Sequence, residues 1–298
     1  MIWLDITRKC QLACVHCYNS SGPQGTKGSM RREDWLRIVR QVADEGIPNI
    51  QFIGGEPTLH PDFPEFLTTA LGRGLEVEVF SNLVRVSEEI WALLRHPRAS
   101  LATSYYSVAA RTHDAVTGRS SHARTRRNIV RAVELSVPIR VGIVGDDAEE
   151  IRSARRELEG LGVTRLGVDH VRRFGRAVGT EPPQMSQLCG RCGSGAAAVG
   201  PDGAVSPCVF STEWPVGNVR DQDLSAVLAG PAMRRANKAI RHAVSGSRDT
   251  AGTCYPKQQP CFPAGQPCEP RGDVPPACNP EDFECAPGTP STGCNPHR

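Results

Sequence analysis

The chain has 298 residues, of which 39% are hydrophobic, and 35 lysines and arginines against 32 acidic residues give a net charge of +3. This length predicts two ordinary domains or one barrel with an appendage, and the balanced charge argues against a nucleic-acid partner. No apolar run is long enough to span a membrane and no signal peptide precedes the first strand pattern, so we expect a cytoplasmic protein with no membrane partner. Twelve cysteines in such a protein predict metal ligands before disulfides.

Short apolar segments alternate with longer periodic segments through the first 170 residues. The strands are expected at 1–6, 49–53, 75–80, 99–105, 137–144 and 164–170. The helices are expected at 31–45, 64–73, 87–95, 123–135 and 147–161. Apolar residues recur in the helical segments at steps of three and four, as at Trp35, Ile38, Val39 and Val42, and several segments stop at a glycine such as Gly46.

Strand and helix units in this order predict an α/β fold with a parallel sheet and helices outside. Six units rather than eight predict a partial (β/α)6 TIM-like barrel, followed by a small cysteine-rich C-terminal extension. We expect the barrel at 1–175, a first part of the extension at 176–250, and an irregular tail at 251–298. In a parallel barrel the chemistry lies at the carboxyl ends of the strands.

Three thiols, Cys10, Cys14 and Cys17, follow the first strand directly. A structural zinc site normally takes four protein ligands, whereas a four-iron cluster held by three thiolates keeps one iron open. The spacing resembles the Cys-x3-Cys-x2-Cys signature of the radical S-adenosylmethionine (radical SAM) enzymes, with His16 at the position where that family has an aromatic residue. The resemblance implies a SAM-binding 4Fe-4S cluster on these cysteines, and SAM itself as a cofactor.

A Gly-Gly-Glu-Pro turn, Gly54, Gly55, Glu56 and Pro57, follows the second strand. Two glycines let a ligand approach the backbone, and the neighbouring carboxylate suits an ammonium group. Such a turn is also a common strand exit. In the radical SAM family this turn binds the amino group of SAM, so the resemblance assigns these four residues to the cofactor.

Weaker candidates for SAM contacts lie at or near later strand ends. In relatives, polar groups at these places hold the carboxylate and ribose, and a glycine packs against adenine. The resemblance extends these roles to Ser81, Asn82, Ser104, Arg140 and Gly145. The alternative is that the polar groups only satisfy local backbone or partner groups. The arginine-rich run 172–176 also resembles the family, but such a run is commonly a solvated face.

A second cysteine region contains Cys189, Cys192 and Cys208, with an Asp202-Gly203 pair that predicts a hairpin turn. A CxxC pair alone fits half of a zinc ribbon or a redox dithiol. The wider spacing resembles the SPASM extension of radical SAM enzymes, which carries auxiliary iron-sulfur clusters. The resemblance makes these three cysteines candidate auxiliary ligands.

The last 48 residues repeat Cys-x-Pro six times in a segment rich in proline and glycine, which cannot form a core of its own. The family's usual second cysteine cluster is missing here. We take Cys254, Cys261 and Cys268 as further candidate ligands, and the cysteine count allows one or two auxiliary clusters. The alternatives are a tail with incidental cysteines, or disulfides.

The resemblance implies that SAM is cleaved reductively to a 5′-deoxyadenosyl radical that takes hydrogen from a substrate. It requires an external low-potential electron donor of the flavodoxin or ferredoxin type, and no catalytic residue beyond the cluster and SAM site. Relatives with this extension often modify a ribosomally made peptide. Because no peptide-binding domain precedes the barrel, a leader peptide would have to be held by a separate peptide-recognition protein or by the tail. The alternatives are a radical SAM oxidoreductase or isomerase acting on a small sugar or antibiotic precursor, or a non-catalytic iron-sulfur or zinc module.

Overall fold

The computed structural model describes residues 1–248, and within them the strands form one nine-stranded sheet. Its order is β6-β5-β4-β3-β2-β1-β7-β8-β9. The strands from β1 to β6 are parallel, β7 pairs parallel with β1, and β8 and β9 are antiparallel additions. Their bounds are β1 Ile2–Asp5, β2 Asn49–Ile53, β3 Glu76–Phe80, β4 Ala99–Tyr105, β5 Ile139–Val144, β6 Arg165–Asp169, β7 Ala197–Val199, β8 Ala204–Ser206 and β9 Gly217–Asn218.

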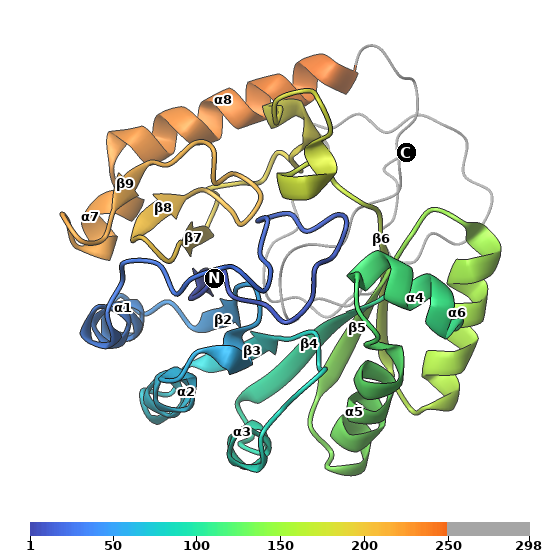
Figure 1. Cartoon of the computed structure of the whole chain (residues 1–298). Helices are drawn as coiled ribbons and strands as arrows, with labels where there is room; N and C mark the ends of the chain where they lie inside the picture. Colours follow the sequence, from blue (N-terminus) through green and yellow to red (C-terminus); the bar gives the residue numbers. More distant parts are fainter. Residues whose placement is uncertain (249–298) are drawn as a thin grey trace, which may run out of the picture.

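Helices cover the outer side of the strands, and the loop after β1 lies on the inner side (Figure 1). The α-helices are α1 Arg32–Asp44, α2 Phe63–Gly72, α3 Glu88–Leu94, α4 Ala110–Thr117, α5 His122–Glu134, α6 Ala148–Gly160, α7 Leu224–Leu228 and α8 Pro231–Arg248. Short 3-10 turns lie at Pro57–Leu59, Gly175–Val178 and Met185–Gln187. None of the helices described is long and apolar enough to cross a membrane.

The hydrophobic periodicity predicts the helices and strands of the barrel correctly because it marks the face of each element that is buried in the core. Trp35, Ile38, Val39 and Val42 are all fully buried on α1, and they pack with β1 and β2 in the main core. Gly46, after α1, has a φ of 66°, a left-handed conformation that costs glycine least and ends the helix. All six strands and five helices predicted for the barrel are confirmed within two residues, and so is the α/β parallel sheet.

The elements that the sequence did not predict are α4, α7, α8 and the pairing of β7 with β1. α4 has little apolar periodicity, since the buried residues on it are His113 and Thr117. The predicted turn at Asp202-Gly203 is confirmed: Gly203 has a φ of 85° and joins β7 to β8. β7 lies in the second expected region, 176–250, yet it continues the sheet of the barrel. The expected boundary between the barrel at 1–175 and this region therefore stays a prediction. Cys254, Cys261 and Cys268 lie outside the described residues.

Candidate functional site

The cysteine loop, residues 6–22, is fixed by backbone hydrogen bonds at both ends. The Cys10 amide donates to the Gly22 carbonyl at 3.0 Å, so the loop closes on itself. The Ala13 amide donates to the carbonyl of Thr117, the last residue of α4, at 2.9 Å. The loop therefore leaves the carboxyl end of β1 and is held over the sheet by a helix that the sequence pattern did not reveal.

The Gly-Gly-Glu-Pro turn after β2 packs directly against this loop. The Gly55 amide donates to the Thr7 carbonyl at 2.6 Å, and the Glu56 amide donates to the Lys9 carbonyl at 2.9 Å. A β-carbon at Gly55 would lie 2.4 Å from the Lys9 oxygen, and one at Gly54 would lie 2.7 Å from the Thr7 oxygen. The close contact between the turn and the cysteine loop therefore requires glycine at positions 54 and 55, whether or not a ligand also approaches the turn.

The Glu56 side chain is completely buried and its carboxylate is saturated by donors of the chain itself. It accepts from the Thr58 amide at 3.2 Å, the Thr58 hydroxyl at 2.7 Å, the Ser81 hydroxyl at 2.8 Å and the Asn82 amide at 2.8 Å. Burial raises the pKa of Glu56, and these hydrogen bonds oppose that shift. Glu56 thus ties the turn after β2 to the end of β3.

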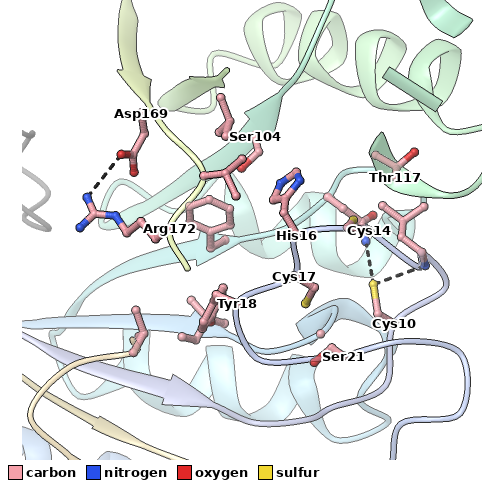
Figure 2. A pocket seen from close by; sticks show the side chains of 18 of the residues that line it. Cys10, Cys14, His16, Cys17, Tyr18, Ser21, Ser104, Thr117, Asp169 and Arg172 are labelled. Atoms are coloured by element: carbon pink, nitrogen blue, oxygen red, sulfur yellow. Dashed lines mark hydrogen bonds and ion pairs between the residues drawn. The ribbon is translucent and has the colours of Figure 1, made fainter. Parts of the chain in front are cut away.

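A cavity of about 310 Å³ opens at the carboxyl ends of the strands. Its wall includes Cys10, Cys14, Cys17, Gly54 and Gly55, so the two principal motifs of the sequence meet at one place. Figure 2 shows the three cysteines on one side of this cavity, and Asp169 with Arg172 on the other.

The weaker candidates divide between the cavity wall and its support. Asn82, Ser104 and Arg140 line the cavity, whereas Glu56, Pro57, Ser81 and Gly145 are not part of its wall. The side-chain nitrogen Nδ2 of Asn82 lies 3.5 Å from the Cys10 sulfur. The Gly145 amide donates to the Asp169 carbonyl at 3.1 Å and so joins the ends of β5 and β6.

Arg140, which lines the cavity, is held by the buried carboxylate of Glu78. Its Nε and Nη2 donate to the two oxygens of Glu78 at 2.9 and 2.8 Å, and the guanidinium lies 5.6 Å from the centre of the Phe80 ring. The Glu78 side chain is only 1% exposed. This bidentate pair fixes the arginine in place.

Other cavity residues could not be found from the sequence. Tyr106 and His113 come from the end of β4 and from α4, and the His16 ring meets Tyr106 edge-on at 5.1 Å. In the arginine run, Arg176 donates from Nε to the Cys14 carbonyl at 2.7 Å, and Arg172 lies 5.0 Å over the Phe210 ring. Part of this run is therefore a wall of the cavity and contacts the cysteine loop. The only sequence signal for it was the family resemblance of the run.

The thiols of the cysteine loop fit a metal cofactor chemically. Burial raises the pKa of Cys10 to about 12 and of Cys14 to about 11, so these thiols stay protonated unless a metal displaces the proton. Within residues 1–248, no three Cys, His, Asp or Glu side chains converge on a point that would hold one metal ion. A four-iron cluster does not need such a point, because each thiolate binds a different iron.

The second thiol site consists of Cys189, Cys192 and Cys208. The sulfurs of Cys192 and Cys208 lie 3.3 Å apart, and both residues are buried. A hydrogen bond from Cys192 lowers the pKa of Cys189 to about 6. The site lies under α8, where the Asn237 side chain donates to the Cys192 carbonyl at 2.7 Å and Ile240 packs in the same apolar cluster.

An aromatic residue, Tyr18, lies near both thiol sites. Burial raises its pKa above the ordinary range, and the thiols of Cys17 and Cys208 both add to that shift. Its ring meets Phe210 edge-on at 5.1 Å. Tyr18, which directly follows Cys17, thus packs against the apolar cluster that contains Cys192 and Cys208.

Comparison with known proteins agrees with this arrangement. Residues 4–158 match the model of the radical SAM superfamily, and residues 189–258 match SPASM, an iron-sulfur cluster-binding domain. The antilisterial bacteriocin subtilosin biosynthesis protein AlbA of Bacillus subtilis is 23% identical over 268 residues, covering 78% of this chain and 60% of AlbA. The PqqA peptide cyclase of Granulibacter bethesdensis is 22% identical over 175 residues, covering 57% of this chain and 47% of the cyclase. The chain thus spans about half of the length of these relatives.

Among solved structures, Streptococcus suis SuiB bound to S-adenosylmethionine has a TM-score of 0.66 at 15% identity, covering 80% of this chain and 67% of SuiB. At that identity the likeness concerns the fold, and it supports the partial barrel. Because the first family model covers more than half of the sequence and its cysteine and glycine motifs line one cavity, the chain belongs to the radical SAM superfamily.

Proposed function

We propose that this chain is a radical SAM enzyme that acts on a ribosomally synthesised peptide. The observation that carries the proposal is the meeting of Cys10, Cys14 and Cys17 with Gly54 and Gly55 in one cavity at the carboxyl ends of parallel strands, which is where barrels of this kind place their chemistry. When bound, a 4Fe-4S cluster and SAM supply reductive cleavage to a 5′-deoxyadenosyl radical, which takes hydrogen from the substrate.

The residues of the chain have separable roles in this proposal. Cys10, Cys14 and Cys17 provide three thiolates, and the backbone at Gly54 and Gly55 provides a surface close to them. Asn82, Ser104 and Arg140 offer polar groups on the wall for SAM. Glu56, Pro57, Ser81 and Gly145 support that wall: Glu56 holds two strand ends together and presents the Asn82 side chain beside Cys10.

The peptide substrate is proposed from the relatives. AlbA is described as a bacteriocin biosynthesis protein, four of the relatives are PqqA peptide cyclases, and SuiB has been crystallised with its precursor peptide SuiA. The cavity is lined by the apolar side chains of Val209 and Phe210 and by the charged side chains of Asp169 and Arg172, which suits a mixed peptide segment. A low-potential electron donor of the flavodoxin or ferredoxin type and a separate peptide-recognition protein complete the proposal.

The test is formation of 5′-deoxyadenosine from SAM by the anaerobically reconstituted protein with dithionite as reductant. Replacing Cys10, Cys14 and Cys17 together by alanine is expected to abolish the product, because no thiolate then remains to hold the first cluster. Val15→Ala is the matched control, since Val15 lies in the same loop with 59% of its surface exposed. Product from the triple variant at the unsubstituted rate would refute the assignment.

The substrate class is tested separately, by incubating the active protein with short peptides encoded beside its gene and following their mass. A mass change that requires SAM and reductant supports the peptide. Turnover of a sugar-like small molecule, with no peptide changed, would overturn it.

A further inference from the structure

The outer face of α8 is strongly basic. The segment Pro231–Arg248 contains no acidic residue, and its exposed cations lie at steps of three and four on one side of the helix. These cations are Arg234, Arg235, Lys238 and Arg241, and the exposed His242 lies beside them.

Arginines of two other helices form ion pairs, although the exposed Arg124 and Arg127 of α5 form none within residues 1–248. Arg131 of α5 pairs with Glu88, and Arg152 of α6 pairs with Glu149. Among the ion pairs within residues 1–248, none includes a cation of α8. The whole chain carries a net charge of only +3, and α8 carries exposed cations without any acidic residue, so its outer face is locally positive.

The inner face of the same helix covers the second thiol site. Asn237 bonds to the Cys192 carbonyl, and Ile240 and Val244 pack in one apolar cluster with Cys192 and Cys208. Figure 1 shows α8 running along the outside of the molecule with the strands β7 to β9 beneath it. A protein seated on the basic face would therefore lie about one helix diameter, roughly 10–12 Å, from these thiols.

We propose that the basic face of α8 docks an acidic one-electron carrier of the flavodoxin class. The carrier is oxidised by one electron, and the iron-sulfur centres of this chain are reduced by one. Charge complementarity selects this occupant, and the position over thiols suited to iron favours an electron carrier over other polyanions. The inference rests on the proposed function, which requires such a donor.

The first test is direct binding, which does not depend on activity. The association of an acidic flavodoxin with the full-length protein is measured by calorimetry at low and high salt. The triple variant Arg235→Gln, Lys238→Gln, Arg241→Gln keeps good helix formers in α8. We expect it to bind at least about tenfold more weakly at low salt, with a smaller salt dependence.

The matched control removes the same charge elsewhere: Arg152→Gln, Arg155→Gln, Arg156→Gln on α6, where the exposed Arg152 and Arg156 and the half-buried Arg155 pair with glutamates. It should bind flavodoxin within about twofold of the unsubstituted protein. Equal weakening by both triple variants would show that only net charge matters, and would overturn a specific docking face.

The second test compares two reductants. The α8 variant should lose flavodoxin-driven 5′-deoxyadenosine formation at limiting flavodoxin, and should keep the dithionite-driven rate. Unchanged flavodoxin-driven rates, or an equal loss with dithionite, would overturn the inference. Weaker binding of a short duplex DNA with unaltered flavodoxin binding would also overturn it. Failure of the proposed function is distinct, because the unsubstituted protein would then form no product even with dithionite.

Discussion

Gly55→Ala tests whether the glycine turn is needed by the protein itself or only by a ligand. A β-carbon there would lie 2.4 Å from the Lys9 carbonyl oxygen, whereas carbon and oxygen normally approach to about 3.3 Å. The carbonyl would have to retreat by roughly 0.9 Å, which breaks the hydrogen bond that it accepts from the Glu56 amide at 2.9 Å. Lys9 directly precedes Cys10, so the cysteine loop would move with it.

The expected cost combines overpacking of about 1–3 kcal/mol with one or two lost hydrogen bonds of about 1 kcal/mol each. We therefore expect the free energy of unfolding in urea to fall by about 2–4 kcal/mol. The iron content after reconstitution should fall as well. Gly72→Ala at the end of α2 is the control, because a β-carbon there meets no atom within 4 Å. If Gly55→Ala unfolds at the same urea concentration as the unsubstituted protein, the packing argument is wrong.

Three further predictions concern the supports of the site. Arg140→Met should lower the free energy of unfolding by about 3 kcal/mol because the buried Glu78 carboxylate then has no cation to pair with. Adding Glu78→Gln should recover most of that loss. Equal instability of the single and double variants would argue against this ion pair as the cause. Burial lowers the pKa of His60 from 6.5 to about 4, against an opposing effect of Asp62. Between about pH 4 and pH 6.5, therefore, His60 binds a proton in the unfolded chain but not in the folded chain. Stability present above about pH 6.5 should thus be lost as the pH falls, by about 1–2 kcal/mol at about pH 5, and urea unfolding of His60→Gln should show a weaker pH dependence. Replacing all three cysteines of the second thiol site by alanine should remove about four irons per chain while dithionite-driven SAM cleavage persists, and an unchanged iron count would contradict its role as a cluster site.

The barrel could be predicted from the sequence because hydrophobic periodicity reports burial directly. Trp35 and Val42 recur at helical spacing since one face of α1 meets the sheet. The cavity could be placed because Cys10 and Gly54 each follow a strand, and parallel strands bring such ends together.

The rest of the site was hidden because it depends on contacts between distant residues. α4 holds the cysteine loop through the Thr117 carbonyl, and its buried His113 breaks the apolar pattern. Arg172 and Arg176 look like a solvated run in the sequence, yet they lie beside Phe210 and the Cys14 carbonyl. Gly54 and Gly55 of the glycine turn line the cavity, but the crowding that requires Gly55 could not be predicted from its spacing.

The position of β1 between β2 and β7 has a consequence for how the protein is made. Ile2 pairs with Ile50 on one side and with Ala197 on the other, so one edge of β1 stays open until nearly two hundred further residues have been synthesised. Open edges invite pairing with other chains, and contacts so distant in sequence slow folding. The cysteine loop is anchored to this strand, so iron delivered before translation reaches β7 would meet a site whose base is still unfinished. We therefore expect soluble, iron-loaded protein to increase when synthesis is slowed or chaperones are co-expressed.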